Sequence, residues 1–141
     1  MEIPQIVRTY IDTFCRGDLD AWLATFAPDG TCSDSGTPQP LSGQALIDHY
    51  GALFAGFPDL TVETVALHAI TTDLAAWRWV IRGTNTGSYR GFPPAGRSLI
   101  LPGCEFIETR EGLVQRVEGY FDRLSMLQQL GVIPAPGQAT R

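Results

Sequence analysis

The spacing of hydrophobic residues changes near the middle of this 141-residue chain. Up to Phe54, hydrophobic side chains recur every three or four residues, which is the period of one helix face. From Leu60 onward they follow, imperfectly, the two-residue alternation of strands, among many β-branched residues. Helices followed by consecutive strands indicate an α+β layer structure rather than alternating βαβ units. We therefore expect a curved antiparallel sheet wrapped around three helices, forming a cone with an internal pocket.

Three helices are predicted in the first part of the chain. Asp18 is a suitable N-cap for a short second helix, and Ser42 for a third helix that ends at Gly56. Pro-Asp-Gly at residues 28–30 predicts a turn, after which residues 31–35 form a short strand. The apolar stripes of the three helices are Ile3, Ile6, Val7, Tyr10, Ile11 and Phe14, then Leu19, Trp22, Leu23 and Phe26, then Leu46, Ile47, Tyr50, Leu53 and Phe54.

The second part of the chain predicts four longer strands, over residues 60–70, 74–86, 98–109 and 113–121. The connection 87–97 is rich in glycine and proline, as hairpin loops are. A last short helix is expected over 124–130, followed by a loose tail at 132–141. The length fits one domain covering residues 1–141.

Composition excludes several classes of partner. The net charge is −5 and the basic residues are scattered, which argues against nucleic acid as a partner. Three cysteines without a CxxC pair, and only His49 and His68, argue against a structural zinc site. The two histidines are assigned surface or satisfied core positions. The sequence contains no signal peptide and no apolar run long enough to span a membrane, so we expect a cytoplasmic protein with free thiols.

Local motifs from Ser42 to Gly131 resemble the SnoaL-like polyketide cyclases, also called ester cyclases, of the nuclear-transport-factor-2-like superfamily. Each motif alone is weak, but together they occur in register over about ninety residues. The motifs are Phe57-Pro58-Asp59-Leu60, Arg78-Trp79 with Gly83-Thr84-Asn85-Thr86-Gly87, Gly91-Phe92-Pro93-Pro94-Ala95-Gly96-Arg97, and Tyr120-Phe121-Asp122 with Gln129-Leu130-Gly131.

The resemblance implies a reaction, a ligand and an assembly. Members of this family close the last ring of an aromatic polyketide by an intramolecular aldol condensation, without a metal or cofactor. The resemblance implies that Asp122 is the general acid/base. It also implies a small apolar organic ligand and a homodimer or homotetramer formed through the outer face of the sheet.

Asp122 is the predicted catalytic residue. A carboxylate in an apolar cavity has a raised pKa and can take a proton from carbon and return one to an alkoxide. The alternative is that Asp122 is the N-cap of the last helix or pairs with Arg123. Strand alternation places Glu118 and Tyr120 on the face of Asp122, and this face either lines the pocket or faces solvent.

Further substrate-binding candidates come from the other motifs. Asn85 occupies a position where the family usually has His, so it keeps a hydrogen-bond donor but loses proton transfer; the alternative is a turn residue. Trp79 is an aromatic pocket candidate, although spacing does not say which face of its strand lines the pocket. Tyr50 is a candidate hydroxyl donor, and Asp34 either a polar pocket group or a turn residue.

The predicted function is a cofactor-free acid/base enzyme that cyclises or isomerises a small apolar carbonyl or polyketide compound. The sequence has no GxSxG elbow, no Walker loop and no dinucleotide fingerprint. The alternative is a non-catalytic ligand-binding or dimerisation module of the same fold, since fold alone does not determine function.

Overall fold

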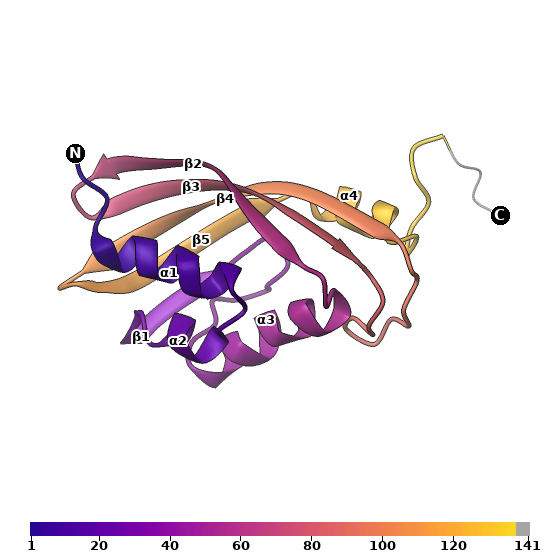
Figure 1. Ribbon diagram of the computed structural model, residues 1–141, viewed down its shortest axis with the longest axis horizontal. Coiled ribbons are helices and arrows are strands. Elements are labelled where there is room, and N and C mark those ends of the chain that lie inside the picture. The colour runs from indigo at the N-terminus through magenta and orange to yellow at the C-terminus, as the bar shows by residue number, and fades with distance from the viewer. Residues whose placement is uncertain (138–141) are drawn as a thin grey trace.

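The computed structural model describes residues 1–137, in which a curved sheet lies over three helices and a fourth helix lies at one end (Figure 1). This confirms the predicted α+β class. The strands are β1 (Phe26–Ser33), β2 (Thr61–Thr71), β3 (Leu74–Thr84), β4 (Ser98–Arg110) and β5 (Leu113–Phe121). The helices are α1 (Gln5–Cys15), α2 (Leu19–Leu23), α3 (Gln44–Gly56) and α4 (Arg123–Gln129).

The strand order in the sheet is β1-β5-β4-β3-β2. Strands β2 to β5 pair antiparallel in sequence order, as short connections require. The prediction of an entirely antiparallel sheet is wrong for β1, which pairs parallel with β5. Strand β1 is separated from the other strands by α3, and such a crossover allows it to enter the sheet in the direction of β5. The sheet stays open, with β1 and β2 at its edges.

Two local predictions in the first part of the chain are wrong. Residues 28–30 do not form the predicted turn before the strand, because β1 already includes them, with a register shift between Phe26 and Thr31. Ser42 does not cap α3. The N-cap is Gly43, whose φ of 58° lies in the left-handed region that glycine adopts without strain, and no side chain caps this helix.

The inner face of the sheet follows from strand alternation. Trp77, Trp79 and Ile81 of β3 are buried, whereas Arg78 and Arg82, which alternate with them on the opposite face, are exposed. This settles which face of β3 is turned toward the helices. The buried ring of Trp77 meets Tyr10 of α1 edge-on at 6.3 Å between centroids, which joins the sheet to the helical layer.

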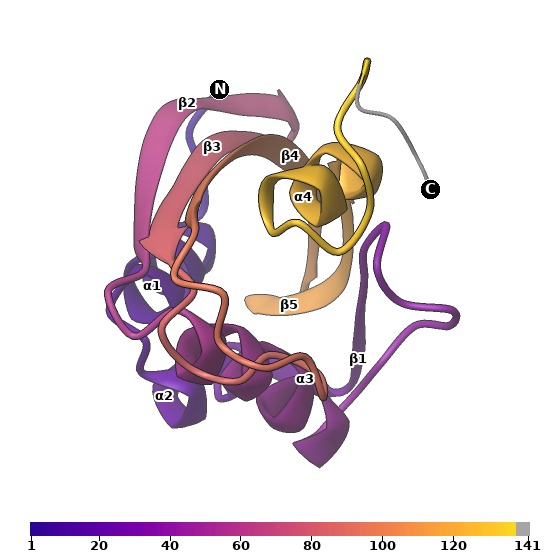
Figure 2. The same cartoon turned by 90° about the vertical axis from the view of Figure 1, so that its right-hand side faces the viewer.

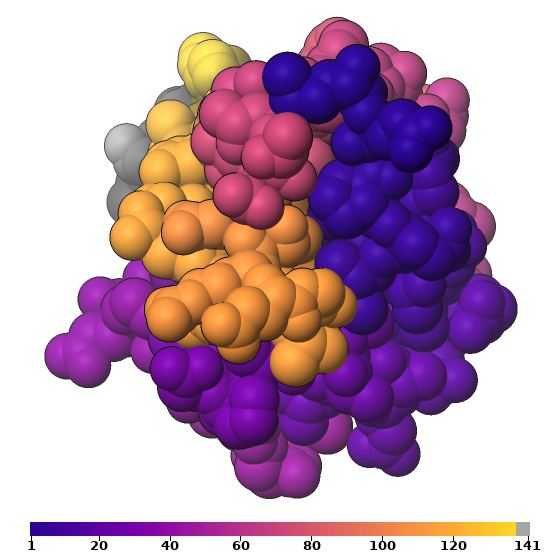
Figure 3. Space-filling view, turned by 90° about the vertical axis from the view of Figure 1, so that its left-hand side faces the viewer, coloured from indigo at the N-terminus to yellow at the C-terminus, as the bar shows by residue number. Residues whose placement is uncertain are grey.

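The two ends of the molecule are closed differently. Figure 3 shows α1 lying against the turns of the β2–β3 and β4–β5 hairpins at one end. At the other end the sheet curves around α4 and the loop between β3 and β4, above α3 (Figure 2). None of the helices in residues 1–137 combines the length and apolar character needed to cross a bilayer. Residues 132–137 contain no helix or strand, and 138–141, the rest of the predicted loose tail, lie outside the described residues.

Candidate active site

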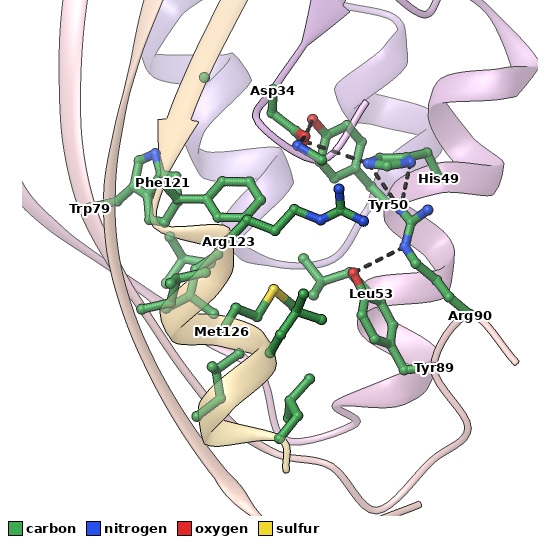
Figure 4. A pocket seen from close by; sticks show the side chains of 18 of the residues that line it. Asp34, His49, Tyr50, Leu53, Trp79, Tyr89, Arg90, Phe121, Arg123 and Met126 are labelled. Carbon is green, nitrogen blue, oxygen red and sulfur yellow. Dashed lines mark hydrogen bonds and ion pairs between the residues drawn. The ribbon is translucent and has the colours of Figure 1, made fainter. Parts of the chain in front are cut away.

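A pocket with a cavity volume of about 120 Å3 lies between the inner face of the sheet, α3 and α4. Its wall is mainly apolar and includes Trp79 and Phe121 from the sheet, Leu53 from α3, and Met126 from α4 (Figure 4). The charged and titratable residues that line it are Asp34, His49, Tyr50, Tyr89, Arg90, Glu105 and Arg123. The pocket therefore combines an apolar wall with a few polar groups, as small-molecule sites usually do.

Glu105 is a carboxylate at an inward position of β4. The inward residues on either side of it along the strand include Leu101 and Ile107, which are buried. The Tyr10 hydroxyl donates a hydrogen bond of 2.6 Å to Glu105 Oε1. Burial raises the pKa of Glu105 to about 7, against the hydrogen bond from Tyr10 and with a further contribution from the charge of Asp34. Near neutral pH, both forms of this carboxyl group are therefore populated.

The second oxygen of Glu105 borders a position without a side chain. Gly119 of β5 is the register partner of Glu105. A Cβ atom at Gly119 would lie 3.7 Å from Glu105 Oε2 and 3.3 Å from Asp34 Cβ. Glycine therefore leaves room beside both carboxylates. Tyr10 holds Oε1, Oε2 borders the space beside Gly119, and a hydrogen bond from Trp79 also acts on the carboxylate and lowers its pKa.

Asp34 follows β1 and is the more strongly hydrogen-bonded carboxylate. It accepts hydrogen bonds from Tyr50 Oη at 2.8 Å and from the Gly36 backbone N–H at 2.6 Å, and His49 Nε2 lies 3.5 Å away. Burial favours the neutral form, but the hydrogen bonds from His49, Tyr50 and Gly36 prevail and hold the pKa of Asp34 below its ordinary value. The pocket thus contains two carboxyl groups whose pKa values are shifted in opposite directions, a pattern typical of acid/base sites.

Two arginines line the pocket near α4 and the β3–β4 loop. Arg90, whose φ is 49°, donates from Nε to Tyr89 Oη at 3.0 Å, and its Nη2 contacts the His49 ring nitrogens. Arg123 is the first residue of α4, and its side chain extends into the pocket (Figure 4). Within residues 1–137, no group of three His, Cys, Asp or Glu side chains is arranged to hold a metal ion.

The sequence profile of the SnoaL-like polyketide cyclases matches residues 4–130, which is most of the chain. The chain belongs to the SnoaL-like polyketide cyclase family.

Solved structures share the fold of this chain. IdmH of Streptomyces antibioticus, assigned as a polyketide cyclase, is 27% identical with a TM-score of 0.76, over 90% of this chain and 96% of its own. A protein of Jannaschia sp. CCS1 assigned as a SnoaL-like polyketide cyclase gives 0.81 at 23% identity, over 95% and 97% of the two chains. AclR of Streptomyces galilaeus, assigned as a hydroxylase, gives 0.81 at 20% identity, over 95% and 83%. A search among curated protein sequences gave no significant match.

Three of the predicted site residues of this SnoaL-like chain line the pocket. Trp79 contributes to the wall because its indole lies over Gly103, where an added Cβ would be 2.3 Å from the ring. Asp34 and Tyr50 lie together on the opposite side, joined by their hydrogen bond (Figure 4). Asp34 is both a pocket group and a turn residue, because it lines the pocket and also accepts a hydrogen bond from the backbone N–H of Gly36.

The expectation that the carboxyl group of Asp122 lies in an apolar cavity is wrong. Asp122 is exposed, does not line the pocket, and accepts a hydrogen bond from Ser125 N at 2.9 Å as the N-cap of α4. Alternation along β5 explains this placement. Gly119 and Phe121 line the pocket, so the residues next to them point the other way.

Glu118 and Tyr120 lie on the outer face of the sheet, and neither lines the pocket. Glu118 accepts a hydrogen bond of 3.0 Å from Arg116 Nε. Tyr120 is 51% exposed and packs edge-on against Phe106 at 6.3 Å between ring centroids. Of the two orientations that the sequence left open for this face, the structure has the outward one, and the prediction that these two residues contact a ligand in the pocket is wrong.

Asn85 holds the β3–β4 loop in place instead of lining the pocket. Its Nδ2 donates to the carbonyl oxygens of Gly56 at 3.2 Å and Gly87 at 2.8 Å, and its Oδ1 accepts from Ala95 N at 3.1 Å. The side chain is therefore fully occupied by backbone groups of the loop and of the end of α3. In this member of the SnoaL-like family, the amide supports the loop that carries Arg90.

Sequence reasoning missed Glu105, Arg90 and Arg123, and it assigned His49 to a surface or core role. For Glu105 a signal existed, because it is a single charged residue among the alternating inward positions of its strand, with Leu101 before it and Ile107 after it. No comparable signal existed for His49 or the arginines, since the approach of α3, α4 and the loop brings them together. His68 is exposed, as the surface assignment expects.

Proposed function

We propose that this protein is an acid/base enzyme that cyclises or isomerises a small apolar carbonyl compound, with Glu105 as the catalytic residue. The observation that carries the proposal is the Glu105 carboxylate, which faces an apolar pocket with one oxygen fixed by Tyr10 and the other beside Gly119. Because burial brings its pKa to about 7, the group is suited both to accept and to donate a proton near neutral pH.

The proposed reaction proceeds in three balanced steps. Ionised Glu105 takes a proton from a carbon next to a carbonyl group, which leaves an enolate. The enolate carbon forms a bond to a second carbonyl carbon of the same molecule, and the electron pair of that carbonyl moves to its oxygen. Protonated Glu105 then donates its proton to the new alkoxide, which restores the carboxylate. Only side chains of this chain are needed for these steps.

Asp34 supports this cycle without exchanging protons. Its lowered pKa keeps it ionised at neutral pH, and its negative charge contributes to the raised pKa of Glu105. Family membership and the likeness to IdmH, which is assigned as a polyketide cyclase, favour a polyketide-like substrate and an aldol cyclisation.

The test compares wild-type protein with Glu105→Gln, and uses Glu108→Gln as the matched control on the exposed side of the same strand. Turnover of a nogalonic-acid-type ester is followed by absorbance, and exchange of its activated C–H protons with deuterium by NMR. We expect Glu105→Gln to lose at least about 100-fold in both rates, and Glu108→Gln to retain them. Full activity in Glu105→Gln would remove Glu105 from the mechanism.

The same experiment addresses the alternative of a non-catalytic binding module. If wild-type protein binds the ester but produces neither cyclisation nor deuterium exchange, the binding module replaces the enzyme as the best account of this pocket. Asp122→Asn serves as a second comparison, because it retains the capping oxygen while changing the acid group that the family resemblance had singled out.

We also propose that two copies associate through the outer face of the sheet, where Phe106 and Tyr120 are 38% and 51% exposed and contact each other. Tyr120→Lys should then shift the mass measured by light scattering toward that of one chain. A cytoplasmic location stays part of the proposal, and the three unpaired cysteines agree with a reducing compartment.

A further inference from the structure

The two arginines that line the pocket differ in how the protein uses them. Arg90 is engaged, because it donates to Tyr89 Oη and contacts the ring of His49. The guanidinium of Arg123 has no hydrogen-bond or ion-pair partner in the part of the chain that the structure describes, residues 1–137. Its side chain nevertheless extends into the pocket, toward the side on which Tyr50 and His49 lie (Figure 4).

The acidic groups of the pocket do not need Arg123. Asp34 already accepts hydrogen bonds from Tyr50 and Gly36 and lies 3.5 Å from His49. Glu105 accepts from Tyr10. No carboxylate within the described chain lies within ion-pair distance of the Arg123 guanidinium. Arg123 is an exposed residue that also lines the apolar pocket, so its guanidinium, which has no protein counter-ion there, is available to bind a charged group of the ligand.

From this we infer the charge of the substrate: Arg123 binds a carboxylate carried by the apolar carbonyl compound that enters this pocket. This inference rests on the proposed function only in that it concerns the ligand of the same pocket. A planar guanidinium matches a carboxylate with two parallel hydrogen bonds. A monoanion also suits the surroundings better than a phosphate, because Asp34 and Glu105 would repel a second negative charge.

The placement of charge also orients the ligand. Arg123 is on α4 and Glu105 is on β4, so the two groups approach the pocket from different elements. A ligand held by its carboxylate at Arg123 would direct its apolar carbonyl portion toward Trp79, Gly119 and Glu105. Arg123 is therefore inferred to determine specificity and to position the substrate, while the proton transfers stay with Glu105.

The test uses two probes with the same ring system, 2-naphthoate and 2-acetylnaphthalene, whose binding is measured by isothermal titration calorimetry. Wild-type protein should bind the carboxylate more tightly than the neutral ketone. Arg123→Gln should weaken binding of the carboxylate about tenfold, which corresponds to the loss of one charge-assisted hydrogen-bonding group, and leave the ketone unchanged. Arg8→Gln is the matched control, because it removes a positive charge from an exposed position of α1. This variant should bind both probes as wild type does.

Added salt supplies a second measurement that does not depend on the fold of a variant. Higher ionic strength should weaken binding of the carboxylate to wild-type protein but not of the ketone. Equal affinity of wild-type protein for the two probes, or an Arg123→Gln variant that keeps the preference for the carboxylate, would overturn the inference. The two proposals fail separately. If Arg123→Gln loses the preference for the carboxylate but Glu105→Gln keeps full turnover, only the catalytic assignment is refuted. If Arg123→Gln keeps the preference but Glu105→Gln loses turnover, only the role of Arg123 is refuted.

Discussion

Replacing Glu105 by Gln should stabilise the protein at alkaline pH even though it removes the proposed catalytic group. The reason is the cost of keeping an ionised carboxylate in an apolar pocket. The pKa of Glu105 rises from 4.5 to about 7 on folding. Each pKa unit corresponds to about 1.4 kcal/mol, so ionised Glu105 destabilises the folded state by about 3 kcal/mol once the pH is well above 7.

The sign of the pH dependence follows from proton binding. Between the unfolded pKa and the folded pKa, the folded state binds more protons than the unfolded state, so wild-type stability falls as the pH rises through this window. Gln cannot ionise, and its side-chain oxygen can still accept the hydrogen bond from Tyr10. The stability of Glu105→Gln should therefore lack this decline, and the difference between the two proteins should grow from near zero at acid pH to its full value at alkaline pH.

The assay is urea denaturation of both proteins from about pH 4 to about pH 9, followed by tryptophan fluorescence. Glu108→Gln, which changes an exposed carboxylate on the same strand, should stay within about 0.5 kcal/mol of wild type. A difference between Glu105→Gln and wild type that is independent of pH, or one in which Glu105→Gln becomes the less stable protein as the pH rises, would refute the argument that Glu105 is buried at a cost.

The remaining predictions concern residues around the pocket. Asp122→Ala should lower the free energy of unfolding by about 1 kcal/mol through loss of the α4 cap, whereas Asp122→Asn should keep most of the wild-type stability. Loss of activity in Asp122→Asn with the fold intact would contradict a capping role. Asn85→Ala leaves three backbone groups without their partner and should cost about 2–3 kcal/mol in urea denaturation, whereas a change below about 0.5 kcal/mol would show that the loop does not need the amide. Tyr10→Phe removes a hydrogen bond to ionised Glu105, so the acid limb of the pH–rate profile should move to higher pH, and an unmoved limb would separate Tyr10 from the titrating group.

Much of the fold could be predicted from the sequence, because it depends on local periodicity. The change from a helical to an alternating pattern gave α1, α3 and the strands β2 to β5 nearly in their observed positions. The prediction failed at β1, where a bulge carries the strand through a Pro-Asp-Gly segment that favours a turn. Pairing with β5 decides the structure of this segment, and that partner is distant in the sequence.

The candidate site was less accessible to sequence reasoning. Alternation divides a strand into two faces but does not say which face is turned inward, and a shift of one residue exchanges them. The resemblance to the family's motifs led to Asp122, which directly follows β5, whereas the pocket is lined by Gly119 of that strand. Choosing between the two required the register between β5 and β4, which pairs Gly119 with Glu105.

The sequence by itself determined the order of helices and strands, the apolar character of the pocket wall, and the supply of a few carboxylates and arginines. Only the tertiary structure decided which carboxylate faces the pocket and which is exposed to solvent. The pKa of a group depends on the atoms around it in space, and the neighbours of Glu105 include Tyr10, which lies 95 residues away in the sequence. Such long-range contacts form only when the sheet packs over the helices, so a local sequence pattern does not predict them.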